Sequence, residues 1–469
     1  MRFVLNDRLV ETRHSPGMPA LDYVRRVAGL TGVKYACREG DCGSCTVLVG
    51  HRLGDGLQYQ VVTSCLVPLG ALADRHVVTV EGLNRTELTP IQQAFVDSGA
   101  SQCGFCTPGF VVSLTGHLLE AASWDVQDAI EAVAGNICRC TGYASIIRSI
   151  EGLLDVLRDK IDLQEPRIPA LVRGRFLPDS FLRIGDLLPT PVAADLEPPS
   201  ESAIVVSGGT DLYVQRPHQL EDGPVYIVPG PVTPAISQDA GFVNLAGTAT
   251  AEDMKQSKIL ESTVGGVDRA MELMGSLPIR NRASIAGNLV NASPIGDMTI
   301  TLLALDAEVG LLAGGDRRVM PLHEFFLGYK KLDLRPAEMV EWVRFAIDGD
   351  RLLFNFEKVS KRTYLDIASV NTAISLKHSG GKLTNVHVSA GGVGPVPMKL
   401  ERTMALLEGS EPTTETALAA AETARTEVSP ITDVRGSAAY KRLLLGQLVL
   451  AHFQVLFELD AGLGVEASA

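Results

Sequence analysis

The eight cysteines of this 469-residue chain all lie within its first 140 residues, and they form two groups of four. One group combines a C-x4-C-x2-C run with a distant cysteine, and the other combines a C-x2-C pair with a C-x-C pair. In chain order the two groups are Cys37, Cys42, Cys45 and Cys65, then Cys103, Cys106, Cys138 and Cys140. Two complete sets of four thiols with none left over indicate that every cysteine binds metal, so we expect an electron carrier.

The first group has the spacing of plant-type [2Fe–2S] proteins, in which thiolates on one tight loop and one distant cysteine hold the cluster. Gly40 and Gly43 in this loop allow unusual backbone dihedrals, and their lack of a side chain lets N–H groups approach cluster sulfides. The loop therefore favours an iron–sulfur cluster.

Two other uses of the cysteines are weaker alternatives. Structural zinc usually takes two C-x2-C pairs, and a C-x-C pair is tight for a tetrahedral site. Disulfides are disfavoured because no signal peptide is evident and the spacing is too tight for an evenly cross-linked secreted domain. Two clusters are the favoured interpretation, with zinc or buried free thiols as the alternative.

Composition narrows the class of protein. The chain is 46% hydrophobic and 21% charged, as globular proteins are, and its net charge of −13 argues against a nucleic-acid partner. No apolar run reaches the roughly 18 residues needed to span a membrane. Residues 1–10 have the pattern of a strand and turn, so we expect a cytoplasmic protein whose thiols stay available to iron.

The length predicts three or four domains, since 469 residues exceed a single core. Residues 1–80 alternate short strands with one helix over 21–30, and residues 81–157 have helical periodicity with Pro90 and Pro108 opening helices. Charged, Pro-containing residues 158–175 indicate a linker. Mixed α/β patterning over 176–350 and strands followed by helices over 351–469 complete a predicted α+β multidomain chain.

Two Gly-containing loops in the α/β region suggest a second cofactor. They lie at residues 207–211, which contain a Gly-Gly-Thr turn, and at residues 283–288. Such a turn alone is more often ordinary loop structure, but two of them in one domain can provide N–H groups for a pyrophosphate. No G-x-G-x-x-G follows a strand, so a Rossmann site is not indicated. Since one-electron clusters usually need a two-electron converter, we expect a flavin.

Several stretches together resemble one family. They are residues 37–45, 102–109, 135–143, 208–211, 291–297, 325–329, 366–368 and 433–438. With them the chain resembles the small, iron–sulfur and FAD-containing subunit of bacterial xanthine dehydrogenases, in the molybdenum hydroxylase family. Because both modules are fused on one chain, the likeness is closer to xanthine dehydrogenase than to the carbon monoxide dehydrogenase branch.

The resemblance implies a fold for each region. Residues 1–80 would form a plant-type ferredoxin-like β-grasp domain, and residues 81–157 a four-helix [2Fe–2S]-binding domain. After the linker, residues 176–350 would form an FAD-binding domain of the vanillyl-alcohol-oxidase and CO-dehydrogenase-flavoprotein type. Residues 351–469 would form a C-terminal CO-dehydrogenase-flavoprotein-like α+β domain.

The resemblance also implies a function. A partner chain with a molybdopterin centre would hydroxylate the substrate, so no residue of this chain is catalytic for hydroxylation. Electrons would pass through the second cysteine group, the first group and FAD to NAD⁺, in a heterotetramer with two copies of each chain. An aldehyde or N-heterocycle hydroxylase, or a stand-alone NADH diaphorase, is the alternative.

The family match further implies site residues. FAD would lie on two loops, made of Val205, Val206, Ser207, Gly208, Gly209, Thr210, Asp211 and Leu212, and of Ser284, Ile285, Ala286, Gly287 and Asn288. Asp297, Lys358 and Tyr329 would lie near the flavin, and Gln102 near the pterin. Two residues depart from the family pattern. Ala286 replaces a common glycine, which requires a negative φ, and Met274 replaces a common aromatic residue.

Overall fold

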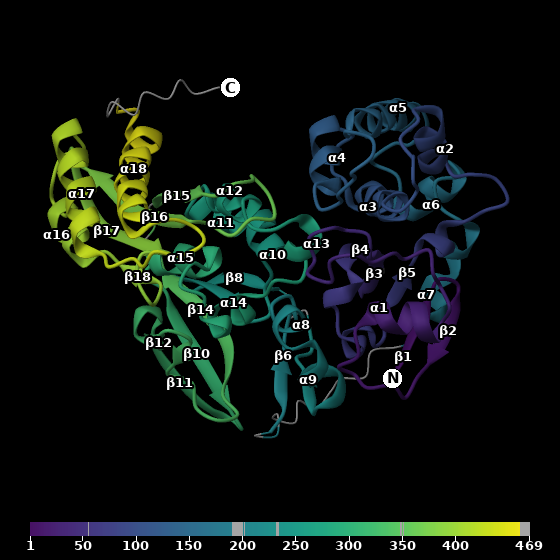
Figure 1. Cartoon of the computed structure of the whole chain (residues 1–469), viewed down its shortest axis with the longest axis horizontal. Coiled ribbons are helices and arrows are strands. Elements are labelled where there is room, and N and C mark those ends of the chain that lie inside the picture. Colours follow the sequence, from purple (N-terminus) through teal and green to yellow (C-terminus); the bar gives the residue numbers. More distant parts are fainter. Residues whose placement is uncertain are drawn as a thin grey trace. The chain divides into compact units, whose positions relative to one another are not determined.

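The computed structural model describes residues 1–54, 56–189, 200, 202–230, 234–347, 349 and 351–459. They form two compact units, whose elements Figure 1 labels along the chain. The first unit contains residues 1–196, 202–229 and 276–282, and the second contains residues 197–201, 230–275 and 283–469. The predicted boundary at residue 350 and the end of the predicted C-terminal domain, residues 460–469, lie outside the described residues.

A five-stranded sheet opens the first unit. Its strands, in the order β2-β1-β5-β3-β4, are β2 (Arg8–Glu11), β1 (Arg2–Leu5), β5 (His76–Val78), β3 (Thr46–Leu53) and β4 (Gly56–Thr63). Strand β1 pairs in parallel with β5, while its other partner β2 is antiparallel. The buried Phe3, Val47 and Val77 of three strands share one core, which explains their apolar character. This is the predicted β-grasp arrangement.

The helix expected over 21–30 is shorter and irregular. It consists of α1 (Ala20–Asp22) followed by the π-helical η1 (Tyr23–Val27). The guanidinium of Arg25 then donates to the carbonyl groups of Thr31 and Val33, which ties the chain down where the regular helix was expected to continue.

Four helices follow the sheet, as expected. They are α2 (Pro90–Asp97), α3 (Thr107–Glu120), α4 (Val126–Val133) and α5 (Ala144–Lys160). Helix α2 begins at a capping box, in which Thr89 and Gln92 satisfy each other's backbone N–H groups. The rings of Phe95 and Phe110 meet in the buried core of this module.

The expectation of an aperiodic linker over 158–175 is wrong for part of the segment. Residues 158–160 complete α5, and α6 (Arg167–Arg173) places Ala170, Leu171 and Val172 in the helical core. Pro166 and Pro169 pointed to a linker, but they occupy the N-cap and the first turn. A missing N–H costs no helical hydrogen bond at these positions.

A small α/β segment also belongs to the first unit. Strands β6 (Ile204–Val206) and β7 (Val225–Ile227) are parallel and are joined through α8 (Leu212–Gln215) and α9 (Pro217–Asp222). Val206, Tyr213 and Leu220 are buried in the same core as the β-grasp strands, and the Tyr213 hydroxyl donates to the Gly17 carbonyl. The short helix α13 (Leu277–Arg280) completes the unit.

The second unit contains two larger sheets. One has the order β11-β10-β14-β9-β8, with β8 (Ile236–Asp239), β9 (Phe242–Ala246), β10 (Glu308–Ala313), β11 (Asp316–Pro321) and β14 (Met339–Ala346). The other has the order β15-β16-β17-β18, with β15 (Leu353–Val359), β16 (Val370–Ser379), β17 (Lys382–Gly391) and β18 (Met398–Lys399). A short hairpin, β12 (Phe326–Gly328) and β13 (Lys331–Leu332), follows the 3-10 turn η6 (Leu322–Phe325).

Helices pack on both sheets of the second unit. They are α10 (Ala251–Gln256), α11 (Lys258–Thr263), α12 (Val267–Glu272), α14 (Ile285–Asn291), α15 (Asp297–Ala304), α16 (Glu401–Leu407), α17 (Thr414–Glu427) and α18 (Ala438–Phe457). Helix α15 is buried along its whole length and contacts β16 and β17. This packing holds Asp297, the first residue of α15, against the sheet that contains β16 and β17.

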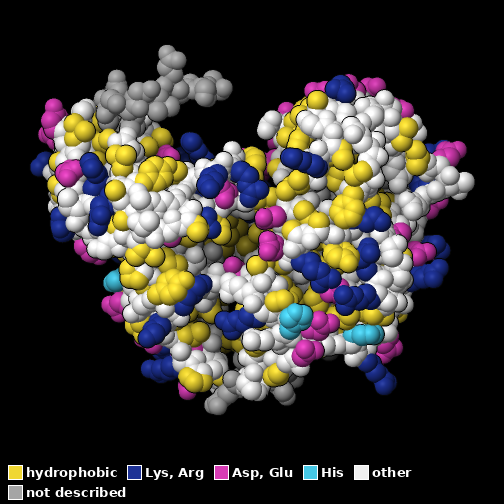
Figure 2. Space-filling view, viewed as in Figure 1, with side chains coloured by type: hydrophobic (Ala, Val, Ile, Leu, Met, Phe, Trp, Pro, Cys, Tyr) yellow, Lys and Arg dark blue, Asp and Glu magenta, His cyan; other side chains and the backbone are white. Residues whose placement is uncertain are grey.

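Charged side chains of both signs are interspersed on the face of the molecule shown in Figure 2. Among the described residues, no helix combines the length and apolar character needed to cross a membrane.

A buried histidine in α18 makes the second unit sensitive to acid. The Asn355 Nδ2 donates to the Nδ1 of His452 over 2.8 Å, and burial lowers the pKa of His452 to about 3. Because the ordinary value is about 6.5, the unfolded chain binds more protons than the folded chain between these two values. Stability is therefore lost as the pH falls from about 6.5 toward 3.

We expect His452→Gln to reduce the pH slope of the unfolding free energy in this window by up to about 1.4 kcal/mol per pH unit. Urea unfolding of both proteins between pH 4.5 and 7 measures the slope. The exposed His378, also in the second unit, provides the control His378→Gln. Identical slopes for the wild type and His452→Gln would show that His452 is not the acid-sensitive group.

Candidate functional site

The first four cysteines converge on the loop that precedes β3. The Sγ atoms of Cys37 and Cys42 are 3.3 Å apart, and those of Cys45 and Cys65 are 3.4 Å apart. Two sulfurs bound at about 2.3 Å to one tetrahedral metal would be about 3.8 Å apart, so each pair fits one metal of a binuclear cluster. The donor set therefore fits a [2Fe–2S] group, with two thiolates for each iron.

The loop is held in place by charge and by backbone bonds. Arg38 has a φ of 58° and donates both of its terminal guanidinium nitrogens to the buried carboxylate of Asp22, at 3.0 and 2.7 Å. The N–H groups of Glu39 and Cys42 donate to the Cys37 sulfur, each over 3.4 Å. A hydrogen bond from Cys37 lowers the pKa of the Cys42 thiol to about 4, so the loop favours a thiolate at this position.

The second four cysteines form two pairs beside helices α3 and α5. The Sγ atoms of Cys103 and Cys140 are 3.6 Å apart, and Cys106 is hydrogen-bonded to Cys138. Burial, followed by this bond, raises the pKa of Cys106 to about 12. The hydroxyl of Thr141 also donates to the Cys138 sulfur over 3.2 Å.

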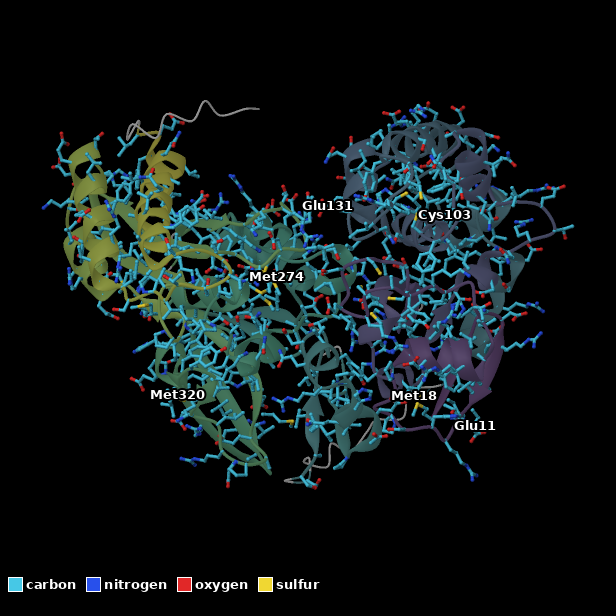
Figure 3. All side chains as sticks on the ribbon, viewed as in Figure 1. Glu11, Met18, Cys103, Glu131, Met274 and Met320 are labelled. Carbon is cyan, nitrogen blue, oxygen red and sulfur yellow. The ribbon has the colours of Figure 1, made fainter. Side chains whose placement is uncertain are left out.

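In the described ranges, no three or more His, Cys, Asp or Glu side chains form a group that could hold a metal ion. The thiols lie in pairs instead, and Cys103 and Cys140 are exposed. In Figure 3, Cys103 and Glu131, a residue of α4, both lie in the module formed by helices α2 to α5. Gln102, next to Cys103, is also exposed.

The two cysteine loops meet through their backbones. The N–H of Ile137, which precedes Cys138, donates to the carbonyl of Cys42 over 3.1 Å. The Asn136 Nδ2 donates to the carbonyl of Gly43 over 3.0 Å, and the Asn136 Oδ1 accepts from Ser113. Cys42 of the first group and Cys138 of the second are thus linked by one hydrogen bond and one peptide unit. Asn136 was not predicted as a site residue, although it lies in the stretch 135–143 that carries the family likeness.

The first flavin loop predicted from the sequence is a tight turn after β6. Gly209 has a φ of 85°, and a Cβ there would lie 2.9 Å from the carbonyl oxygen of Leu66, the neighbour of Cys65. The Ser207 and Gly208 carbonyls accept hydrogen bonds from Arg282. Within the described residues, the N–H groups of Gly208, Gly209 and Thr210 donate no hydrogen bond. The turn can therefore offer consecutive donors to a phosphate group.

The second predicted loop forms the start of α14, in the second unit. The Ser284 hydroxyl accepts from the Gly287 N–H over 3.1 Å and caps the helix. Ala286 lies in the helix without a positive φ, so its methyl group is tolerated as the sequence analysis requires. Its N–H donates to the Gly247 carbonyl over 2.8 Å.

Asp297 and Lys358, each predicted to lie near the flavin, form an ion pair in the second unit. The Lys358 ammonium donates to the Asp297 Oδ2 and to the Leu273 carbonyl, each over 2.8 Å. The side chain of Lys358 is only 2% exposed, and that of Asp297 is 12% exposed. Met274, labelled in Figure 3, follows Leu273, so the residue that departs from the family pattern adjoins this pair.

Asn371 in β16 was not recognised in the sequence. Its Nδ2 donates to the Asp297 Oδ1 over 2.6 Å and to the Ile295 carbonyl over 3.2 Å, which orients the carboxylate toward Lys358. Asn371 is one of several polar residues in this strand, so the sequence gives no clear signal for it. Tyr329 is 65% exposed after β12, and no bond joins it to Asp297 or Lys358 in the described chain.

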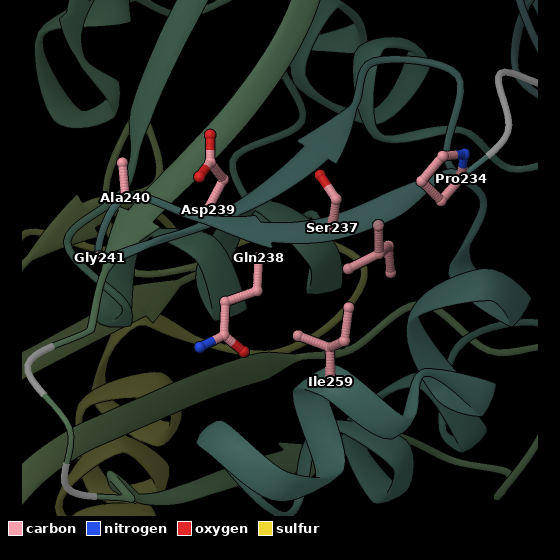
Figure 4. Close-up of a pocket in the computed structure, with 8 residues that line it drawn as sticks. Pro234, Ser237, Gln238, Asp239, Ala240, Gly241 and Ile259 are labelled. Atoms are coloured by element: carbon pink, nitrogen blue, oxygen red, sulfur yellow. The ribbon is translucent and has the colours of Figure 1, made fainter.

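A pocket in the second unit is lined by residues other than those predicted for the site. It is lined by Pro234, by residues 236–241 and by Ile259 (Figure 4). None of the cysteines or predicted flavin residues lines it, so this pocket gives no support to the predicted site.

We expect Gly43→Ala to separate the two cysteine loops. A Cβ at Gly43 would overlap the Gly135 carbonyl and the Asn136 side chain, and the φ of 64° adds strain. Gly29 has a φ of 70° with open space around it, so Gly29→Ala carries the strain alone, about 1 kcal/mol. Gly43→Ala should cost more unfolding free energy than this control and weaken the magnetic interaction of two reduced clusters in EPR. Equal costs and unchanged spectra would contradict the close backbone contact.

We expect Asp297→Asn to destabilise the second unit by about 3 to 5 kcal/mol, because it leaves the buried Lys358 ammonium without its counter-charge. In denaturant unfolding, the double variant Asp297→Leu with Lys358→Met should lose less unfolding free energy than the sum of the losses for Asp297→Leu alone and Lys358→Met alone. The exposed Lys258–Glu261 pair is the control, where Glu261→Gln should change stability by about 0.5 kcal/mol or less. Additive costs at Asp297 and Lys358 would contradict the pairing.

Comparison with known families covers most of the chain. Matches are found to the 2Fe-2S iron-sulfur cluster binding domain at residues 3–69, the [2Fe-2S] binding domain at 79–151, the FAD binding domain in molybdopterin dehydrogenase at 191–345, and the CO dehydrogenase flavoprotein C-terminal domain at 356–455.

Among curated proteins, the xanthine dehydrogenase/oxidase of Rattus norvegicus is 29% identical over 440 residues, covering 81% of this chain and 33% of the relative. The xanthine dehydrogenase of Calliphora vicina is 27% identical, with 86% and 35% covered. Aldehyde oxidase 4 of Cavia porcellus is 28% identical, with 87% and 35% covered. The chain therefore spans about a third of the length of these relatives.

Two solved structures share the fold of a large part of the chain. Carbon monoxide dehydrogenase from Hydrogenophaga pseudoflava, in a form lacking the Mo-pyranopterin moiety, matches with a TM-score of 0.52 and 24% identity, covering 56% of this chain and 91% of that one. Quinoline 2-oxidoreductase from Pseudomonas putida 86 matches with a TM-score of 0.51 and 22% identity, covering 57% and 92%. The four domain matches show a chain with two [2Fe–2S]-binding domains and an FAD-binding domain. With the relatives, they show that the chain is similar to the iron–sulfur and FAD-binding part of xanthine dehydrogenases and aldehyde oxidases.

Proposed function

We propose that this chain carries electrons from the molybdopterin centre of a partner chain, through its second and then its first cysteine group, to FAD. The observation that carries the proposal is the hydrogen bond from the Ile137 N–H to the Cys42 carbonyl, because it joins the two cysteine groups within one compact unit. Short covalent and hydrogen-bonded connections of this kind suit transfer between two fixed centres.

The same unit extends the connection toward the flavin turn. Leu66 follows Cys65, and its carbonyl lies against Gly209 of the turn after β6. The first cysteine group is thus adjacent in the chain to a backbone group that contacts the predicted diphosphate turn. This arrangement supports the order second group, first group, flavin.

Each cofactor has its proposed ligands on this chain. The first cluster would be held by Cys37, Cys42, Cys45 and Cys65, and the second by Cys103, Cys106, Cys138 and Cys140. FAD, when bound, accepts electrons singly and delivers them in pairs, which a [2Fe–2S] cluster does not do. In the first unit, N–H donors of residues 208–210 would face the diphosphate. In the second unit, the Asp297–Lys358 pair stays a separate prediction for a flavin contact.

The exposed second group supports a partner on that side. Cys103, Cys140 and Gln102 are exposed, and Phe105 and Ile137 beside them are 43% and 41% exposed. Electrons would enter here from a molybdopterin-binding chain, in a heterotetramer with two copies of each chain. The final acceptor would be NAD⁺, with the exposed Tyr329 near the site of hydride transfer.

The relatives support a proposal for the substrate class of the complete enzyme. Xanthine dehydrogenases account for most of the curated relatives given above, which favours a purine. The likeness to an aldehyde oxidase at 28% identity makes an aldehyde hydroxylase the second candidate. The partner chain would decide between them, since the hydroxylation site would lie there.

We expect the purified chain to contain about four iron atoms, four sulfides and one releasable FAD, because it offers two sets of four thiols. NADH should reduce the flavin and then both clusters under anaerobic conditions, and two distinct EPR signals should develop. The chain alone should not hydroxylate hypoxanthine or an aldehyde, and adding the partner should restore that activity. Zinc in place of iron, a single EPR signal, or turnover by the rigorously purified chain would contradict the proposal.

A further inference from the structure

Arg282 lies beneath the turn that follows β6, in the same compact unit. Its Nη2 donates to the Ser207 carbonyl over 3.2 Å and to the Gly208 carbonyl over 3.1 Å, and its Nε also approaches the Gly208 carbonyl at 3.3 Å. These three contacts bind one planar guanidinium to two consecutive peptide groups. Lysine, with a single nitrogen, cannot reproduce this forked geometry.

The charge of Arg282 has no carboxylate partner in the part of the chain that the structure describes. Burial lowers the pKa of Arg282 to about 10, and the positive charge of the neighbouring Arg75 also lowers it. A guanidinium stays protonated with such a pKa at neutral pH, so a positive charge remains beside the turn. Keeping a desolvated charge next to a like charge is costly unless an anion offsets it.

The orientation of the peptide groups tells where that anion would lie. In a trans peptide unit the C=O and the following N–H point in opposite directions. Because the carbonyls of Ser207 and Gly208 face Arg282, the N–H groups of Gly208 and Gly209 face away from it. These are the same N–H groups that donate no hydrogen bond within the described residues.

Hydrogen bonds at one end of a peptide group polarise the other end. A carbonyl that accepts from a cation makes the N–H of the same peptide unit a stronger donor, by cooperative polarisation. Arg282 therefore fixes the direction of two N–H groups and strengthens both of them. The contact of Gly209 with the Leu66 carbonyl restrains the turn from its other side.

We infer that Arg282 is a positioning residue for a diphosphate group bound at the turn of residues 207–210: it clamps the two carbonyls, aims the opposite N–H groups at the diphosphate and supplies its counter-charge. The inference rests on the proposed binding of FAD, and it assigns the diphosphate half of that ligand to this turn. The isoalloxazine half makes no contact with Arg282 in this assignment.

The experiment compares two ligands that share the ring system but differ in the diphosphate. FAD carries it and riboflavin does not. Purified full-length chain is stripped of flavin, and the binding of both ligands is measured by fluorescence quenching for the wild type, Arg282→Met and Arg282→Lys. Arg216→Met is the matched control, because Arg216 is exposed and lies six residues after Thr210 in the same unit.

We expect Arg282→Met to bind FAD at least tenfold more weakly, with riboflavin binding unchanged. Arg282→Lys should recover only part of the loss, since it restores the charge but not the fork. The dependence of FAD affinity on salt concentration should also become shallower in Arg282→Met, and Arg216→Met should behave as the wild type. Iron content and circular dichroism of each variant verify that the unit has folded.

The outcomes separate the inference from the function on which it rests. If the wild type binds no FAD, the proposed function fails. If the wild type binds FAD and Arg282→Met binds it equally well, the inference is wrong. If Arg282→Met loses FAD and riboflavin to the same extent, or loses its iron, Arg282 supports the fold alone and the inference is again overturned.

Discussion

The hydrogen bond between Ile137 and Cys42 depends on a very close approach of two backbones, and the rest of the first unit is built to permit it. Gly43 has no side chain where the loops touch, and its carbonyl accepts from the Asn136 amide as well as from the N–H and the hydroxyl of Thr46. A buried carbonyl without such a partner would cost free energy comparable to a lost hydrogen bond. Two metal-binding loops from different parts of the sequence are thus joined by a backbone hydrogen bond and by the amide side chain of Asn136.

Segment 276–282 has a comparable role on the other side of the first cysteine loop. The Asn281 Nδ2 donates to the Val61 carbonyl over 2.9 Å, and the Arg280 guanidinium pairs with Glu131 over 2.9 Å. Arg282 bonds the turn after β6. One short segment therefore contacts the β-grasp sheet, the helical module and the turn after β6.

The sequence could predict whatever depends on local pattern. The cysteine spacings, the proline-initiated helices and the strands near residues 46 and 354 required only neighbouring residues, and the structure places them within a few positions of the expected bounds. Asp297 and Lys358 were also found, but through family likeness. The segment at 158–175 shows the limit, because prolines that look like linker signals occupy the first turn of α6.

What the sequence could not predict are partners brought together by the fold. Asn136, Asn371 and Arg282 act on backbone carbonyls or on a carboxylate from 74 to 93 residues away. An acceptor carbonyl leaves no mark in the sequence, since every residue has one. Arg282 follows Arg280 and Asn281, and Asn371 is one of several polar residues in β16, so neither residue stands out in the sequence.

The alternation of the two units along the chain has a consequence for biosynthesis. Residues 1–196 and 202–229 belong to the first unit, but its last piece, residues 276–282, is translated only after residues 230–275 of the second unit. A nascent chain that has already exposed all eight cysteines still lacks the partners of Glu131, Val61 and the turn after β6. The segment that joins these parts of the first unit is thus translated after both cysteine groups and after residues 230–275 of the other unit.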